Sequence, residues 1–86
     1  MQIRYHKNFE KHFRLLPEKL KQKTKFIIAR FIQEPTHSSL RNHPLTGRLK
    51  GKRAISVTGN LRIIFEEYNN YVIVLMLDIG THNQIY

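Results

Sequence analysis

The chain has 86 residues, of which 15 are Lys or Arg and 6 are Asp or Glu, so its formal net charge at pH 7 is +9. A hydrophobic fraction of 41% is too high for a disordered chain, and the absence of cysteine excludes disulfide bonds and thiolate metal sites. The longest apolar runs are about half as long as a membrane span. We therefore expect a single cytoplasmic domain over residues 1–86, with no membrane segment.

Basic residues are concentrated in the middle of the chain, where residues 35–65 contain no Asp or Glu. Charge of this size works against folding, so we expect it to serve binding. Nucleic acid is the usual polyanionic partner, although an acidic protein, a membrane surface or a merely solvated face would also account for it. The basic residues of this stretch are Arg41, Arg48, Lys50, Lys52, Arg53 and Arg62.

The first half of the chain predicts a strand followed by two helices. Met1–Tyr5 alternates apolar and polar residues, as a half-buried strand does. Asn8 is a candidate N-cap for a first helix over residues 9–16. Pro17 suits the first turn of a second helix, which is expected to end near Glu34. Two helices joined by so short a connection form an antiparallel hairpin.

The second half changes to the two-residue period of strands, after a loop-like segment over residues 36–51. Strands are predicted at residues 53–57, 61–67 and 71–79. The last is almost entirely apolar, which is typical of a central strand covered on both faces, and we expect the first strand of the chain to pair beside it. The order β-α-α-β-β-β predicts an α+β fold, with the helix hairpin packed on a four-stranded, mostly antiparallel sheet.

The residues available for chemistry are Arg, Lys, His and Tyr, since the chain has no paired carboxylates at useful spacing and no glycine-rich phosphate loop. We expect no cofactor and no metal site, because no carboxylate cluster accompanies His6 and His12. This set of residues suits RNA cleavage without a metal, in which His moves protons and Arg holds the phosphate. On spacing alone, His43 and His82 are a loop and a tail histidine bonded to nearby groups, and His6, His12 and His37 are surface residues.

Four short motifs nevertheless follow one another in a recognisable order. They are His43-Pro44-Leu45-Thr46-Gly47, Lys50-Gly51-Lys52-Arg53, Leu61-Arg62-Ile63-Ile64-Phe65 and Gly80-Thr81-His82-Asn83-Gln84-Ile85-Tyr86. Together they resemble the RelE superfamily of toxin–antitoxin toxins, and most of all its YafQ branch, which has a His-Pro-Leu-x-Gly loop, a Lys-Gly-x-Arg strand entry and a Gly-Thr-His ending. The predicted order of elements agrees with the fold of that family over the whole chain.

The resemblance implies the toxin of a type II toxin–antitoxin system, an endoribonuclease that cleaves mRNA on the 70S ribosome by attack of the 2′-hydroxyl. It implies His43 and His82 as the proton-transferring or phosphate-contacting pair, Arg62 as a phosphate or transition-state contact, and Tyr86 as a ring that stacks on the RNA. Ribosomal or messenger phosphates are expected at Lys50, Lys52, Arg53, Arg48 and Arg41. An acidic, partly disordered antitoxin is the expected partner, so the chain would be a monomer alone or part of a hetero-oligomer.

Three positions depart from the pattern of the YafQ branch. Ser56 stands where that branch has a further histidine, and Asn60-Leu61 stands where it has an Asp-Trp pair. These departures leave the acid and base roles of His43 and His82 open. Two alternatives also stay open: a ribosome-binding module whose catalytic site has decayed, and a gyrase-targeting toxin of the ParE type. The Gly-Thr-His ending favours the nuclease.

Overall fold

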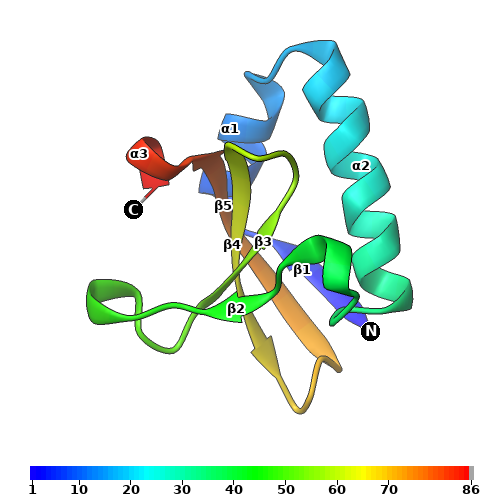
Figure 1. The fold of residues 1–86 in the computed structure, drawn as a ribbon, viewed down its shortest axis with the longest axis vertical. Coiled ribbons are helices and arrows are strands. Elements are labelled where there is room, and N and C mark those ends of the chain that lie inside the picture. Colours follow the sequence, from blue (N-terminus) through cyan, green and yellow to red (C-terminus); the bar gives the residue numbers. More distant parts are fainter. Residues whose placement is uncertain (86) are drawn as a thin grey trace.

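The computed structural model describes residues 1–85 (Figure 1). Two helices from the first half of the chain pack on one face of a mixed sheet, which confirms the predicted α+β class. The elements are β1 (Gln2–Tyr5), α1 (Lys7–Arg14), α2 (Glu18–Gln33), β2 (His43–Pro44), β3 (Arg53–Ser56), β4 (Leu61–Tyr68), β5 (Ile73–Thr81) and α3 (His82–Ile85), with short 3-10 helices η1 (Ser38–Leu40) and η2 (Gly47–Leu49).

Within residues 1–85, five strands form the sheet in the order β1-β5-β4-β3-β2. β1 is parallel to β5, which confirms that the first strand lies beside the last, and the other neighbouring pairs are antiparallel. The predicted count of four strands is wrong by one. The additional strand is β2, in which His43 pairs with Ala54 and Pro44 with Arg53. Two residues, one of them a proline, are too few to show the alternation by which strands are recognised.

The helix boundaries follow local capping chemistry. α1 begins at Lys7 because His6 is its N-cap, and the His6 Nδ1 accepts a 3.0 Å hydrogen bond from the backbone N–H of Asn8. The prediction of Asn8 as the N-cap is therefore wrong by two residues. α2 begins directly after Pro17, whose φ of −57° is compatible with a helix, and it ends at Gln33, close to the predicted end.

The core lies between α2 and the sheet face that this helix covers. Phe31 of α2 is fully buried, and its ring makes edge-on contacts with Phe65 and Tyr71 at centroid distances of 5.0 and 6.0 Å. Burying a large side chain of this kind contributes roughly 1.5–3 kcal/mol to folding. The other members of the buried cluster are Phe9, Ile27, Leu40, Ile55, Val57, Leu61, Ile63, Val74, Met76 and Ile79.

A bulge in β5 decides what lies on the opposite side of the sheet, which we call the open face. Ile64 pairs with Asp78 but Phe65 pairs with Met76, so Leu77 is an extra residue in β5. Alternation from Met76 would otherwise place Gly80 on the core side, and the extra residue moves it to the open face. The chain therefore leaves β5 toward the open face.

The open face is only partly covered. Leu75 and Leu77 of β5 are half-buried, whereas Val74 and Met76 on the core side are fully inaccessible. The prediction that this strand is covered on both faces is therefore only partly right. α1 and α2 contribute to the core on one face, and α3 covers the end of the strand at Gly80 on the other. Polar and charged side chains of the open face remain accessible for chemistry.

Candidate active site

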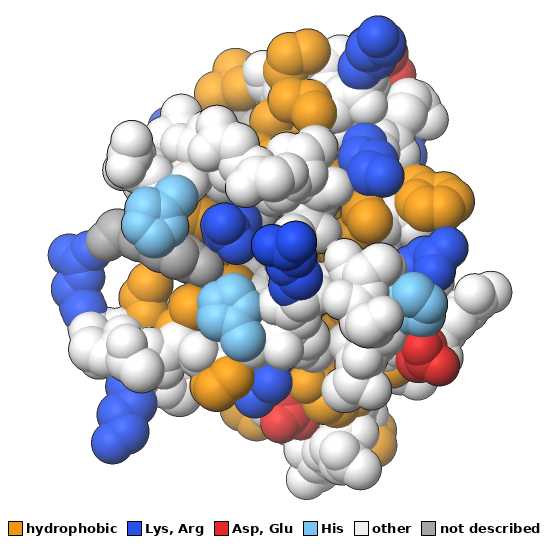
Figure 2. Space-filling view, viewed as in Figure 1, with side chains coloured by type: hydrophobic (Ala, Val, Ile, Leu, Met, Phe, Trp, Pro, Cys, Tyr) orange, Lys and Arg blue, Asp and Glu red, His pale blue; other side chains and the backbone are white. Residues whose placement is uncertain are grey.

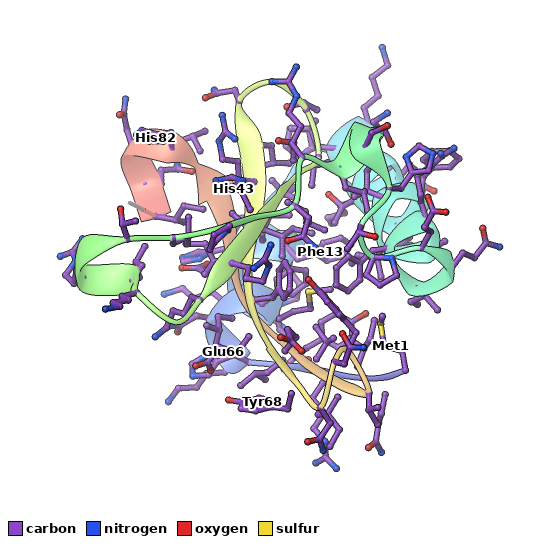
Figure 3. All side chains as sticks on the ribbon, turned by 60° about the horizontal axis from the view of Figure 1, so that its bottom comes forward. Met1, Phe13, His43, Glu66, Tyr68 and His82 are labelled. Carbon is purple, nitrogen blue, oxygen red and sulfur yellow. The ribbon has the colours of Figure 1, made fainter. Side chains whose placement is uncertain are left out.

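The open face brings together side chains from neighbouring strands and from the C-terminal helix. Ser56 of β3 lies opposite Arg62 of β4, and Arg62 lies opposite Gly80 of β5. His43 belongs to β2, two strands from β4, or about 10 Å at the usual strand spacing. The strand order thus places Arg62 between β2, which carries His43, and the end of β5, which leads into His82. Figure 3 labels the two histidines.

His43 is oriented by the backbone of its own loop. Its Nδ1 donates a 2.7 Å hydrogen bond to the carbonyl of Arg41, and because a carbonyl only accepts, Nδ1 carries the proton. Arg41 has a left-handed φ of 53°, an uncommon conformation for a residue other than glycine. In neutral His43 the lone pair is therefore on Nε2, which can accept a proton from a substrate.

Arg62 has weaker partners than a half-buried guanidinium normally finds. Its Nη1 lies 3.4 Å from the Ser56 hydroxyl and its Nη2 lies 3.5 Å from the Gly59 carbonyl, both at the long limit for a hydrogen bond. Its Nε is buried, and no group within residues 1–85 accepts a hydrogen bond from it. Buried polar groups are nearly always paired, so this guanidinium has hydrogen-bonding capacity that residues 1–85 leave unused, and a guanidinium is a strong donor to phosphate oxygens.

The segment that carries His82 folds back onto the open face at Gly80. A Cβ at Gly80 would lie 2.8 Å from Cγ2 of Ile85 and 3.0 Å from Oε1 of Gln84, so glycine is what lets the segment come this close. The backbone N–H of Thr81 donates a 2.8 Å hydrogen bond to the same Gln84 oxygen. His82 is the first residue of α3 and is exposed at this end of the site (Figure 3).

Several of the predicted binding cations lie around η2, next to the open face. Arg48 and Lys50 are exposed there. Lys52 is half-buried, and its Nζ lies 4.0 Å from Oε2 of Glu66. Figure 2 shows Lys, Arg and His side chains spread over this side of the molecule, with few acidic ones between them. This surface attracts polyanions without being specific for any one of them.

Arg53 has partners in the interior instead. Its Nε donates a 2.8 Å hydrogen bond to the Asn42 side-chain oxygen, and the Asn42 amide donates to the Pro35 carbonyl at 2.9 Å and to the Tyr71 hydroxyl at 3.0 Å. This network ties the loop before β2 to the core. The structure therefore does not bring Arg53 together with Arg62.

His12 and Asp78 form a contact that sequence reasoning missed, since His12 was expected to be a surface residue. Its Nδ1 lies 2.6 Å from Oδ1 of Asp78, which also accepts a 2.8 Å hydrogen bond from the backbone N–H of Ile79. The contact joins α1 to β5 at the end of the strand that leads to the site. No local pattern indicates a pair of residues 66 positions apart.

Tyr5 and Tyr68 are not suited to act as bases. Burial raises the pKa of Tyr5, and the negative charge of Glu66 raises the pKa of Tyr68, so both hydroxyls stay protonated near neutral pH. Tyr86, the predicted stacking residue, lies outside the described residues 1–85.

Within residues 1–85, no three side chains of His, Cys, Asp or Glu are grouped so that they could hold a metal ion. None of the helices in this part of the chain is both long and apolar enough to cross a bilayer.

The fold of this chain is similar to the folds of several solved toxin structures. The crystal structure of YafQ from E. coli strain BL21(DE3) matches it with a TM-score of 0.83 at 21% sequence identity, over 99% of this chain and 97% of that chain. The YoeB/ParE toxin from Agrobacterium tumefaciens matches with a TM-score of 0.79 at 13% identity, over 95% and 99%. The toxin–antitoxin complex RelBE2 from Mycobacterium tuberculosis matches with a TM-score of 0.73 at 19% identity, over 94% and 96%.

Family membership follows from the sequence itself. The model of the family described as "Bacterial toxin of type II toxin-antitoxin system, YafQ" matches residues 1–86. The chain therefore belongs to the YafQ family of type II toxins, which confirms the resemblance carried by the four motifs. No curated protein matches the sequence.

Proposed function

We propose that this toxin is an endoribonuclease that cleaves messenger RNA on translating 70S ribosomes and so stops translation. The observation that carries the proposal is Arg62, whose buried Nε has no acceptor within residues 1–85 and which lies between the strand of His43 and the segment of His82. A guanidinium in this position is suited to hold a phosphate. Imidazoles on its two sides are suited to move protons to and from the reacting oxygens.

The proposed reaction is an attack of the RNA 2′-hydroxyl on the adjacent phosphorus. A base takes the hydroxyl proton, the O2′–P bond forms, the P–O5′ bond breaks, and an acid protonates the leaving O5′. The products are a 2′,3′-cyclic phosphate and a 5′-hydroxyl. We assign the base to His43, since its Nδ1–H is bonded to the Arg41 carbonyl and its lone pair is on Nε2. His82 is then the acid, and Arg62 stabilises the charge on the phosphorane oxygens.

The openness of the site supports a dependence on the ribosome. His82 is exposed and His43 is only half-buried. Attack requires the 2′-oxygen, the phosphorus and the O5′ to be held in line, and a shallow surface does not impose that geometry on a flexible strand. The ribosome would supply it, while Arg48, Lys50 and neighbouring cations contact ribosomal or messenger phosphates.

An acidic antitoxin is the second partner that we propose. Solved structures include the E. coli DinJ–YafQ toxin–antitoxin complex, whose toxin is similar to this chain with a TM-score of 0.80 at 21% identity. A net charge of +9 favours an acidic partner, and a partly disordered one can order itself along the basic surface as it binds. The toxin would then act in the cytoplasm as a monomer and be held inactive in a hetero-oligomer.

Cleavage on translating ribosomes tests the proposal, with the ends of the message mapped by primer extension. His43→Ala and His82→Ala remove the two proposed proton carriers, and His6→Ala is the control because it removes a histidine that caps α1. We expect wild type and His6→Ala to cut at the same positions, and the two site variants to bind ribosomes without cutting. Undiminished cutting by both site variants would contradict the assignment.

The second candidate function is ribosome binding without cleavage, and two residues favour it. The Ser56 hydroxyl is only a distant partner of Arg62, and Leu61 is buried in the core cluster. Neither supplies the histidine or the aromatic ring that the YafQ branch has at these positions. A message left intact by ribosome-bound wild type would establish this candidate. An arrest of DNA replication before translation would instead indicate a gyrase-targeting toxin.

A further inference from the structure

A groove between α2 and the turn that joins β3 to β4 lies beside the candidate active site. It encloses about 440 Å³, and its walls include Lys23, Phe26 and Arg30 of α2, Arg41 of the loop before β2, and Ser56 of β3. Figure 1 shows α2 facing this turn, and Figure 2 shows hydrophobic side chains interspersed with Lys and Arg along the α2 side of the same view. None of the residues described as lining the groove is Asp or Glu.

Phe26 is the unusual residue of this groove, because its side chain is 55% exposed. The Nζ of Lys23 and the Cζ of Arg30 each lie 5.5 Å from the centroid of its ring. The Nη1 of Arg30 also lies 3.1 Å from the Nε2 of His37, so the guanidinium lies between this imidazole and the ring. An exposed ring among three cations, the third being Arg41, suits an unpaired nucleobase whose phosphates lie on either side.

The groove is continuous with the candidate active site. Ser56 and Gly59 line it, and they are also the groups that lie 3.4 and 3.5 Å from the Arg62 guanidinium. Arg41 lines it as well, while the Arg41 carbonyl accepts the hydrogen bond that orients His43. A strand whose phosphate is held at Arg62 therefore enters the groove within a short distance.

We propose that this groove binds the single-stranded RNA next to the cleaved phosphate, with one unpaired base stacked on Phe26 and phosphates on Lys23, Arg30 and Arg41. The inference rests on the proposed function, because the RNA has to pass Arg62 to enter the groove. A base on the ring displaces one of the two cations there, and its flexible side chain then reaches a phosphate. An acidic protein segment also complements the charge, but the continuity with Arg62 favours RNA.

Binding of a short fluorescent single-stranded RNA to the full-length toxin tests the inference by anisotropy. The 2′-hydroxyls of the probe are methylated, so the toxin cannot cleave it. Phe26→Leu keeps an apolar side chain but removes the ring, and Tyr68→Leu makes a comparable change at an exposed ring of β4 that does not line the groove. We expect Phe26→Leu to weaken binding about fivefold or more, and Tyr68→Leu to leave it within about twofold of wild type.

The cations are tested by the salt dependence of the same binding. Lys23→Gln removes a groove cation, and Lys19→Gln removes an exposed lysine of the same helix that does not line the groove. Each phosphate contact with single-stranded nucleic acid contributes about 0.7 to the slope of log K against log salt. We expect Lys23→Gln to lose a contribution of this size and Lys19→Gln to keep the slope of wild type.

Equal RNA affinity of wild type and Phe26→Leu would overturn the inference. If that variant also lost antitoxin binding, the groove would be assigned to the protein partner. Because the probe cannot be cleaved, binding and activity are measured separately. Phe26-dependent RNA binding by a toxin that cuts no message would refute the proposed function and still support the groove as an RNA site.

Discussion

The two faces of the sheet differ in whether their buried polar groups have hydrogen-bond partners. On the face covered by α2, the one buried polar side chain of the described residues is Thr24, and its hydroxyl donates a 2.7 Å hydrogen bond to the Leu20 carbonyl. On the open face, Arg62 has a buried Nε without an acceptor in residues 1–85. The first arrangement stabilises the fold, whereas the second leaves a bonding capacity for a substrate. Substitutions on the first face should therefore change stability, and those on the second should change activity.

The largest effect is expected at the histidines of the open face. His82→Ala should lower the cleavage rate by about 10²- to 10⁴-fold, because it removes a proton donor from an exposed position. Single-turnover cleavage on ribosomes measures the rate, and thermal unfolding measures the stability of each variant. His6→Ala should do the reverse, with a stability loss of about 1 kcal/mol from the missing N-cap and an unchanged rate. If His82→Ala were destabilised but cut at the wild-type rate, His82 would serve the fold and not the reaction, which contradicts the proposed division between the two faces.

The next largest effect belongs to the covered face. Phe31→Ala should lower the free energy of unfolding by about 3–5 kcal/mol, because the cavity lies at the centre of the aromatic cluster. Phe26→Ala on the same helix removes an exposed ring and should change it by less than about 0.5 kcal/mol. Urea unfolding followed by circular dichroism distinguishes them. Similar values for the two variants would show that the core is not where we place it.

Arg62→Gln sharpens the comparison, since it changes a half-buried residue of the open face. The cleavage rate should fall about 10²- to 10³-fold with the loss of a charge that stabilises the transition state. The free energy of unfolding should change little, because the guanidinium makes only long hydrogen bonds of 3.4 and 3.5 Å within the described chain. Arg4→Gln, at an exposed position of β1, controls for the loss of net charge. A marked loss of stability with retained cleavage would make Arg62 a residue of the fold.

The smallest effect is expected at the glycine that lets α3 dock. Gly80→Ala pushes the added Cβ against Ile85 and Gln84 and so displaces His82, which should slow cleavage about tenfold or more. The loss should appear in kcat with little change in KM, because the surfaces that bind the ribosome are untouched. Wild-type kcat would show that the position of the tail does not matter to the reaction.

The sequence predicts those parts of the fold that rest on local signals. The apolar face of α2 is periodic, the strands after residue 52 are apolar stretches separated by turn residues, and a proline near each end of α2 limits its length. β2 is missed because two residues show no period, and the N-cap is missed because histidine is not a usual cap. The bulge at Leu77 cannot be predicted from the sequence either. When all residues of a run are apolar, nothing shows at which residue the side chains switch from one face of the sheet to the other.

For the candidate site, too, the sequence predicts some features and misses others. Motifs single out His43, Arg62 and His82 because each motif is a short stretch of chain. The proton on the His43 Nδ1 depends on the conformation of its own loop, and the lack of an acceptor for the Arg62 Nε within residues 1–85 depends on how neighbouring strands pack. Spacing reveals neither. Arg53 is an example. It lies in a motif and in the basic stretch, so it was predicted to bind phosphate, but its side chain donates a hydrogen bond to Asn42.

The central claim is that the open face cleaves RNA by attack of a 2′-hydroxyl. Its most direct test is a reconstituted translation reaction with wild-type toxin and a message that carries a single 2′-deoxynucleotide immediately before a mapped cleavage position. The account predicts that cutting is lost at that position alone and continues at the unmodified ones. Cutting at the deoxy position, or an intact message with the toxin bound to the ribosome, would contradict it.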